Sequence, residues 1–550
     1  MKEFFQKLGR KLTGRKGIGA TMTAVIIIAV VMLNVLAYTV TNAFGLYVYS
    51  PPKRDFSLSG STDSLFQSAI DSEKKVTITF CYTQDKLETH ETGSYVLGTA
   101  LQFAERYPDL IELKFLNLLT KMDAEGNLVD LKPYANVVCS SKGENGKTCG
   151  QSARYPDAVK NPRCKACGNT LDPDKDIVYN LRQNSVIFES GEGEEWSCRV
   201  LTDRSSTAGF VDFFTIDSTA TIVAYNGEEV MASMISWVLH RDHPVAYFTQ
   251  NHGETADIAF SNLLTCAGYY VEVINLRKQE IPEDAGMLII SNPTSDFDRA
   301  ADGSQTRGEL DKIEDYLVNK GGKLYVALDP YVKELTNLES TLAKWGITVS
   351  AQTNEHGVLV RDIVREDANA ITPDGYTFIA THADNETATK IRDKVVAYGN
   401  DSILMSEVTR LVLDETKGAQ PLLVSGSASS TYAGGTKTDG AGNYAVCAYS
   451  TQTHEEGRTS TVFVIPTAYI TATDAFQSEN YSNKDFLYST FEVLFGSNPA
   501  PRGCNQVLYT SGILENLTMG KAKTYAAIIF AVPVILAAVG VITLRRRKNR

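Results

Sequence analysis

The stretch RGELDKIEDYLVNKGGKLYVALDP, residues 307–330, decides the fold class because it places a helix-forming segment directly before a strand-forming one. Two earlier runs, PVAYFTQ (244–250) and GMLIISNP (286–293), are also typical of strands. Strands that alternate with helices of about 10 to 15 residues indicate a mostly parallel sheet covered on both faces. We therefore predict an α/β fold with a Rossmann-like lobe over residues 221–350, continued by strands and loops over 351–520.

The region before this lobe shows a second α/β pattern. KKVTITFCYT (74–83) is typical of a strand, ETGSYVLGTALQFAERYP (91–108) of an amphipathic helix, and LIELKFLNL (110–118) of another strand. This order predicts a thioredoxin-like β-α-β lobe within residues 74–220. Because Cys81 stands alone, the redox dithiol of that fold is absent.

Two apolar stretches lie near the ends of the chain. Met22–Val40 and Tyr525–Leu544 each lack charged residues, and each is long enough to cross a bilayer core of about 30 Å as a helix. We place transmembrane helices at 17–43 and 524–544. A cleaved signal peptide is the alternative for the first, but its long apolar stretch and the absence of a clean Ala-x-Ala site favour a retained anchor.

The charge distribution predicts a topology. Residues 1–16 and 545–550 each carry a net charge of +5, which leaves −22 on residues 17–544. By the positive-inside rule, both basic ends lie in the cytoplasm, and the acidic bulk, entered through a linker at 51–73, lies outside. The prediction is therefore a double-pass protein of a bacterial cell membrane. An acidic body without a basic stripe also argues against a nucleic-acid partner.

Four cysteines gather in one polar segment, residues 137–175, which we interpret as an insertion in the first lobe. Their spacing is Cys139-x9-Cys149-x14-Cys164-x2-Cys167. The second pair has the spacing of a zinc knuckle, whereas the first pair is too widely spaced for one. Three alternatives stay open: structural zinc held by all four thiolates, one or two disulfides, or unlinked thiols. In the first two cases the role is structural, because the segment lacks apolar residues for a core of its own.

The same segment contains an incomplete phosphate-binding pattern. Gly146, Lys147 and Thr148 fill the last three positions of a Walker A loop, but Ser141 stands where its first glycine is required. No strand and helix flank the run, so there is no helix N-terminus to receive a phosphate. We therefore predict no nucleotide cofactor.

Polar residues follow the strands of the Rossmann-like lobe. Since ligand sites of such sheets form at the carboxyl ends of strands, the candidate ligand-binding residues are Asn251, His252, Glu254, Asn292 and Asp329. His252 and Glu254 could act as acid-base partners, and the alternative is that Asn251 and His252 cap the following helix. No combined signature of a hydrolase is present, so we predict that the chain is not an enzyme.

The order of these segments resembles the GldG-like family, the gliding-motility type of auxiliary component of ABC-type transport systems. The stretches that carry the resemblance are KKVTITFCYT, VAYFTQNHGE, GMLIISNPTSDF, LDKIEDYLVNKGGKLYVALDP, VFVIPTAYIT, NYSNKDFLYSTFEVLFG and VILAAVGVITLRRRK. The resemblance implies a non-catalytic, membrane-anchored extracytoplasmic subunit that works with a separate ABC permease and ATPase. It also implies that the second lobe is similar to amidotransferase-like and sugar-binding folds without their catalytic residues. The alternative function is an extracytoplasmic sugar- or peptide-binding receptor, and a hydrolase is less favoured.

Overall fold

The computed structural model describes residues 56–508, apart from internal gaps at 143–145, 166, 203–209, 211–212, 217–221, 241–242, 256–257, 301–306, 333, 355, 477 and 479. The chain divides into two compact units, Met1–Asp55 and Phe56–Arg550. All the described residues belong to the second unit.

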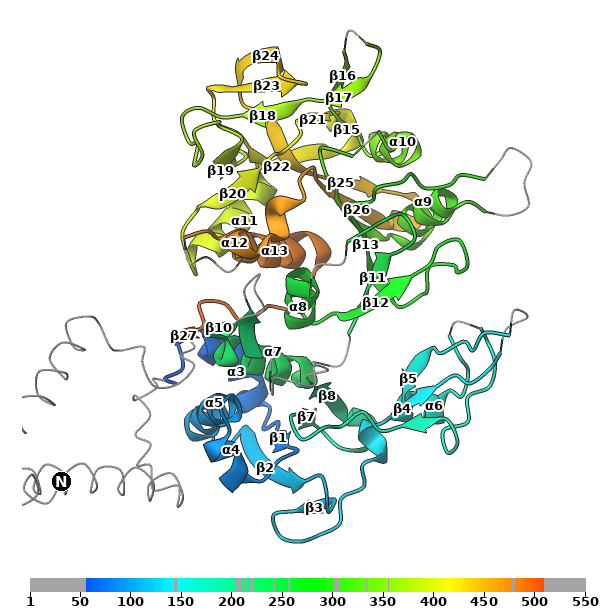
Figure 1. Cartoon of the computed structure of the whole chain (residues 1–550), viewed down its shortest axis with the longest axis vertical. Coiled ribbons are helices and arrows are strands. Elements are labelled where there is room, and N and C mark those ends of the chain that lie inside the picture. Colours follow the sequence, from blue (N-terminus) through cyan, green and yellow to red (C-terminus); the bar gives the residue numbers. More distant parts are fainter. Residues whose placement is uncertain are drawn as a thin grey trace, which may run out of the picture. The chain divides into compact units, whose positions relative to one another are not determined.

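The first sheet has five strands in the order β3-β2-β1-β7-β8 (Figure 1). Its strands are β1 Val76–Phe80, β2 Ile111–Asn117, β3 Met122–Asp123, β7 Val186–Ser190 and β8 Ser197–Leu201, and the nearby helices are α3 Ser61–Asp71, α4 Gln84–Thr89, α5 Gly93–Arg106 and α7 Gly227–Leu239. Strands β1 and β2 are parallel, whereas β7 is antiparallel to both β1 and β8. Alternate residues of β1 (Val76, Ile78 and Phe80) are fully buried in one core with residues of α5 and α7.

The second sheet is larger and has eleven strands. Nine follow the order β12-β11-β13-β14-β26-β25-β22-β19-β20, and β15 and β21 pair at its side. The strands are β11 Val245–Thr249, β12 Tyr270–Ile274, β13 Ala285–Ser291, β14 Lys323–Ala327, β15 Ile347–Val349, β19 Thr377–His382, β20 Ile403–Ser406, β21 Leu411–Leu413, β22 Ala419–Val424, β25 Ala445–Thr453 and β26 Thr459–Ile465. The strands from β12 to β26 are parallel, and from β26 to β20 neighbouring strands are antiparallel.

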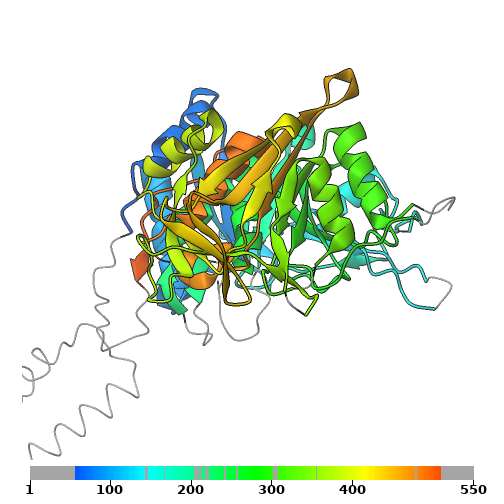
Figure 2. The same ribbon diagram turned by 90° about the horizontal axis from the view of Figure 1, so that it is seen from above.

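Two hydrophobic cores lie on opposite faces of the parallel part of this sheet. The helices that contribute to them are α8 Ile258–Cys266, α9 Glu309–Lys320, α10 Thr336–Lys344, α11 Glu386–Val396 and α13 Asn483–Thr490. Val245 and Tyr247 of β11 belong to the core of α9 and α10, whereas Ala246 and Phe248 belong to that of α8, α11 and α13. Seen from above, α9 and α10 (green) and α11 (yellow-green) lie on different sides of the sheet (Figure 2). Each strand therefore supplies apolar side chains to both faces, as its period of two requires.

Helix α9, from the stretch that decides the fold, has defined ends. The backbone N–H of Gly308 donates to Oδ2 of Asp311 at 2.8 Å, which satisfies a donor that the first turn leaves unpaired. At the other end Gly321 has φ +65°, a left-handed conformation that glycine adopts without strain. The chain then enters β14 two residues later.

The remaining described elements form smaller sheets and short helices. The sheets are β27-β10-β9, β16-β17, β18-β23-β24 and β5-β4-β6. Their strands are β4 Asn136–Val138, β5 Ser152–Arg154, β6 Ile177–Val178, β9 Phe214–Ile216, β10 Ile222–Tyr225, β16 Ala351–Thr353, β17 Leu359–Arg361, β18 Ile363–Arg365, β23 Ser429–Ala433, β24 Thr436–Gly442 and β27 Val507–Leu508. The helices are α6 Tyr155–Lys160, α12 Thr473–Phe476, η1 Lys132–Tyr134, η2 Gly193–Glu195, η4 Glu415–Lys417, η5 Glu455–Gly457, η6 Tyr469–Thr471 and the π-helical turn η7 Phe491–Phe495.

The structure corrects two of the predictions. Among the described residues, every helix is either too short or too polar to cross a membrane. The predicted fold class with flanking transmembrane helices, and the double-pass membrane location derived from it, are contradicted by this finding. The architecture of the described part is mixed α/β with several sheets. The two stretches on which the prediction rested, 17–43 and 524–544, lie outside the described residues.

An ion pair joins α10 to the end of β17. Nη1 of Arg361 donates to Oε2 of Glu339 at 2.9 Å, and Nη2 donates to the other carboxylate oxygen. The two side chains are only 9% and 12% exposed. A two-pronged contact of this kind fixes geometry as well as charge.

Replacing Arg361 with methionine should lower the free energy of unfolding by about 3 kcal/mol, because the Glu339 carboxylate would stay buried without its cation. Urea denaturation followed by circular dichroism would measure the loss. The matched control is Lys390→Met, which removes the exposed partner of Glu386 and should cost less than about 0.5 kcal/mol. Equal losses in the two variants would contradict this account of the Arg361 pair.

Candidate metal centre and the strand-end residues

The small β5-β4-β6 sheet brings the four clustered cysteines together. Cys139 directly follows β4 and Cys149 lies three residues before β5, and these strands are antiparallel. The backbone N–H of Cys139 donates to the carbonyl of Gln151 at 2.8 Å, and that of Gly150 donates to the carbonyl of Cys139 at 3.0 Å. This pairing closes a hairpin. The first two thiols therefore lie close together in space, although nine residues separate them in the sequence.

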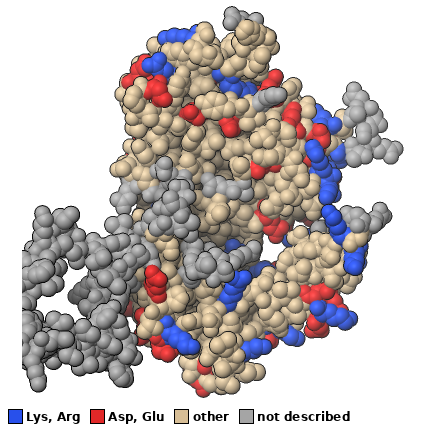
Figure 3. All heavy atoms as spheres, viewed as in Figure 1, with Lys and Arg blue, Asp and Glu red and all other residues tan. Residues whose placement is uncertain are grey.

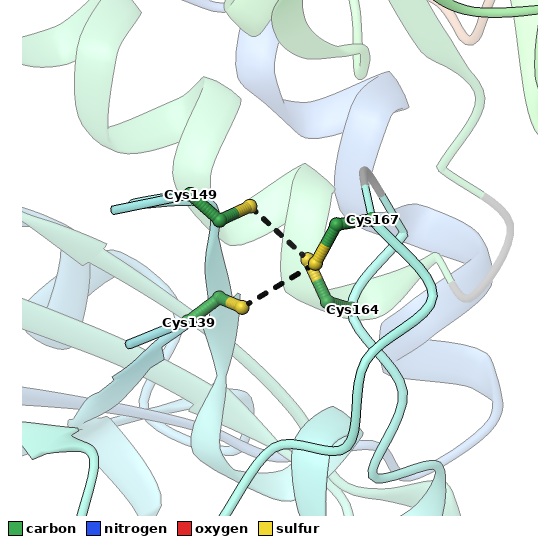
Figure 4. A group of neighbouring side chains, drawn as sticks. All are labelled: Cys139, Cys149, Cys164 and Cys167. Carbon is green, nitrogen blue, oxygen red and sulfur yellow. Dashed lines mark hydrogen bonds between the residues drawn. The ribbon is translucent and has the colours of Figure 1, made fainter. Parts of the chain in front are cut away.

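The second pair of cysteines lies in a tight turn. The backbone N–H of Gly168 donates to the carbonyl of Cys164 at 2.8 Å, and the N–H of Cys164 donates to the carbonyl of Asn169 at 2.9 Å. Gly168 has φ +70°, so a residue with a side chain would be strained there. The turn directs Cys164 and Cys167 toward the hairpin thiols (Figure 4).

The sulfur atoms have the separation that a tetrahedral metal site needs. Sγ of Cys139 lies 3.6 Å from that of Cys167, and Sγ of Cys149 lies 3.7 Å from that of Cys164. All four lie within 4.8 Å of one another, so the cluster could hold a metal ion. Zn–S bonds of about 2.3 Å in a tetrahedron place neighbouring sulfurs about 3.8 Å apart, which matches the cluster.

The four thiols have different surroundings. The backbone N–H of Asn169 lowers the pKa of Cys167 to about 7, because it stabilises the thiolate of this exposed side chain. Burial is the largest cause that raises the pKa of Cys149. A metal ion binds thiolates rather than thiols, so the lowered pKa of Cys167 favours its metal-binding form.

The insertion has a very small core and is held from outside as well. Among the described residues, its buried apolar cluster consists of Val137, Cys139, Ala158, Cys164 and Leu171, with a few half-buried residues packed against it. Lys165, which lies between the two cysteines of the tight turn, forms an ion pair of 2.7 Å with Asp284, the residue before β13. The turn that supplies two sulfurs therefore also supplies a contact to the larger sheet.

Sequence reasoning missed the hairpin that brings Cys139 and Cys149 together, although a signal for tight turns at the cysteines exists. Both Cys149 and Cys167 are followed by a glycine, in the repeated pattern Lys-x-Cys-Gly, and Gly150 also has a positive φ, +71°. The Gly146-Lys147-Thr148 run belongs to this hairpin, because Thr148 forms a bridge with Lys142. The next regular element is the strand β5 and not a helix.

The predicted strand-end residues differ in their exposure and in their contacts. Asn251 follows β11 with φ +88° and is exposed, whereas His252 is 1% exposed. The backbone N–H of His252 donates to Oε2 of Glu254 at 2.7 Å. Glu254 therefore binds the backbone of His252, and this contact holds the turn after β11.

The imidazole of His252 contacts a residue that the sequence did not single out. Its Nε2 lies 3.0 Å from Oε1 of Glu309, the first residue of α9, and Glu309 is 2% exposed. The ring stacks on Phe297 with a centroid distance of 4.0 Å. Oε2 of Glu309 also accepts from the backbone N–H of Asp298 at 3.1 Å. The signal in the sequence was an acidic residue in the first turn of a helix that follows a strand end.

The other two candidates lie at turns. Asn292 has φ +50°, and its backbone N–H donates to the carbonyl of Ala327 at 2.9 Å. Asp329 accepts from the backbone N–H of Tyr331 at 2.9 Å. The cavity beside Asp329 has a volume of about 10 Å³, which is room for about one water molecule. Each of the two residues thus shapes the end of its own strand.

Replacing His252 with alanine should lower the free energy of unfolding by about 2 to 4 kcal/mol. The change removes the partner of Oε1 of the buried Glu309 carboxylate, whose other oxygen keeps its contacts with Asp298 and Arg277, and it removes the ring that packs on Phe297. Thermal and urea unfolding would measure the loss. His356→Ala, at an exposed position, is the control and should change stability by less than about 0.5 kcal/mol. An unchanged stability in His252→Ala would refute the structural role of this residue.

The chain was compared with protein-family models, curated proteins and solved structures. No protein-family model and no curated protein matches the chain. The solved structure titled mmIFT52 N-terminal domain is similar at 13% identity and a TM-score of 0.32, covering 46% of this chain and 97% of that one. PurLQS from Thermotoga maritima is similar at 11% identity and a TM-score of 0.25, covering 46% and 99%. At these TM-scores the likenesses carry no argument about fold or function.

Proposed function

We propose that the chain is a non-catalytic accessory subunit of an ABC-type transport system and works with a separate permease and a separate ATPase. The observation that carries the non-catalytic part is the burial of His252 against Glu309 and Phe297. A general base must come within hydrogen-bond reach of its substrate, and this imidazole is enclosed by its own chain. The accessory part rests on the GldG-like order of the sequence segments.

A tagged copy of the full chain, purified from its native cells in mild detergent, should bring down a multi-span permease and an ATPase. Mass spectrometry would identify both proteins, and the same tag on an unrelated chain of similar acidity is the control. The expected result is enrichment of both partners over that control. Repeated recovery of neither would contradict the accessory role.

We also propose that the four clustered cysteines hold one structural zinc ion in this subunit. The support is the match between the sulfur separations and a tetrahedron, together with donors of a single soft type, which suit zinc. When bound, zinc would supply a cross-link between the hairpin and the tight turn. With four protein ligands no position is left open for substrate, so the site is closed and structural.

The purified chain should contain about one zinc ion, and chelation should lower its melting temperature because the insertion loses its cross-link. Cys139→Ser and Cys164→Ser should each abolish retention of the metal. Cys266→Ser, which alters a thiol outside the cluster, should retain one zinc ion. Atomic absorption and titration of free thiols would measure both quantities. A metal-free protein with four reactive thiols, or with these four oxidised, would contradict the zinc site.

A further inference from the structure

An open cleft lies between the insertion and strand β8, and it has no part in the function proposed above. Its volume is about 770 Å³, within the range of about 300 to 1,000 Å³ that small-molecule sites occupy. Arg154 of β5, Arg199 of β8 and Tyr270 of β12 lie in its wall, so three separate sheets contribute to it. Such a position between elements far apart in sequence is common for ligand sites.

The wall of this cleft is basic in an acidic protein. Three arginines (Arg154, Arg182 and Arg199) line it, and among the described residues that line it there is no aspartate or glutamate. The whole chain carries a net charge of −12. On the face drawn in Figure 3, the β4–β6 region at the right carries both basic (blue) and acidic (red) side chains, so the basic character belongs to the cleft wall and not to the whole region. The cleft therefore favours an anion.

Arg199 is the residue that makes this cleft unusual. Among the described residues, no carboxylate acts on its guanidinium, and its Nε is buried without a hydrogen-bond partner. Its guanidinium instead lies 5.2 Å from the ring centroids of both Trp237 and Tyr270. Burial lowers the pKa of Arg199, but arginine stays protonated in proteins. Arg199 is half-buried. A cation that is partly removed from water without a carboxylate beside it is costly, and an anionic ligand would lower that cost.

The groups around Arg199 are arranged for further polar contacts. The guanidinium of Arg154 lies 5.3 Å from the same Tyr270 ring and is bound through two hydrogen bonds to Asp157. Oη of Tyr270 and Nε1 of Trp237 are also buried without hydrogen-bond partners in the described structure. Unsatisfied donors gathered at one place in a fold are rare, because burying a donor without an acceptor is costly.

We propose that this cleft binds a small organic anion, a sugar-sized ring that carries a phosphate or a carboxylate group. The guanidinium of Arg199 would bind the anionic group, since its planar fork matches both phosphate and carboxylate oxygens. Arg182 at the exposed rim adds charge, and the aromatic residues Tyr179 and Trp196 of the wall offer apolar surface to the ring. The cleft is a ligand site distinct from the cysteine cluster and from the strand-end residues.

Tryptophan fluorescence is a direct probe for this site. The chain has three tryptophans, and two of them, Trp196 and Trp237, lie in the cleft wall or against Arg199. The full chain would be titrated with glucose 6-phosphate, glucuronate, inorganic phosphate and neutral glucose. We expect saturable changes with the first two and none with glucose. The stronger of the first two identifies the anionic group, and binding of inorganic phosphate alone reports an anion hole without a ring subsite.

Variants separate the cleft from unspecific charge. Arg199→Gln should weaken binding of the preferred anion roughly tenfold or more, because a hydrogen bond to a charged group is lost. Arg182→Gln should weaken it less. Lys160→Gln removes an exposed cation of α6 outside the cleft wall and should bind as the parent does. Circular dichroism would check folding, and if Arg199→Gln does not fold, Arg182→Gln decides, because its side chain is exposed.

The proposal is overturned if none of the three anions binds, if glucose binds as tightly as its 6-phosphate, if inorganic phosphate alone binds, or if a folded arginine variant binds like the parent. None of these outcomes depends on a permease or an ATPase, and the zinc content of the same chain is measured separately. A failure here is therefore distinguishable from a failure of the transport role or of the metal site.

Discussion

Burial of both faces of the parallel strands is the constraint on which the larger sheet depends. A strand covered on one face needs apolar residues only at alternate positions, but β11 must fill two cores at once. Polar residues therefore occur at the ends of such strands, where the chain turns. In this protein Asn251 lies after β11 and Asn292 after β13, both in the left-handed conformation that asparagine tolerates better than most residues. Their first role follows from the geometry of the backbone.

The strands of the parallel part could be predicted from the sequence, because they are continuous apolar runs. The run 244–250 contains β11, and the run 286–293 contains most of β13. The antiparallel half of the same sheet could not be predicted as part of it, because it joins the parallel half through the pairing of β26 with β14, which lies far earlier along the chain. The correction of the fold class has a different origin, since hydropathy alone does not show whether a segment forms a helix in the fold.

The candidate sites, like the larger sheet, were only partly predictable from the sequence. The grouping of four cysteines in a short polar segment could be recognised from the sequence. Their closeness in the structure agrees with it. The hairpin that unites Cys139 with Cys149 was not predicted, since a nine-residue spacing says nothing about strand pairing. The burial of His252 was equally hidden, because its partner Glu309 lies 57 residues further along the chain. Local patterns indicate which residue types are present, and only tertiary contacts determine which of them solvent can reach.

The position of the insertion has a consequence for association between molecules. Strand β12 is one margin of the eleven-stranded sheet, and an uncovered margin presents backbone groups that can recruit a strand from another chain. The insertion stands against this margin, with Arg154 stacked on Tyr270 of β12 and Lys165 paired with Asp284. Charged side chains at such a border oppose edge-to-edge aggregation. A segment too poor in apolar residues to fold on its own thus helps to keep the sheet of its host from polymerising.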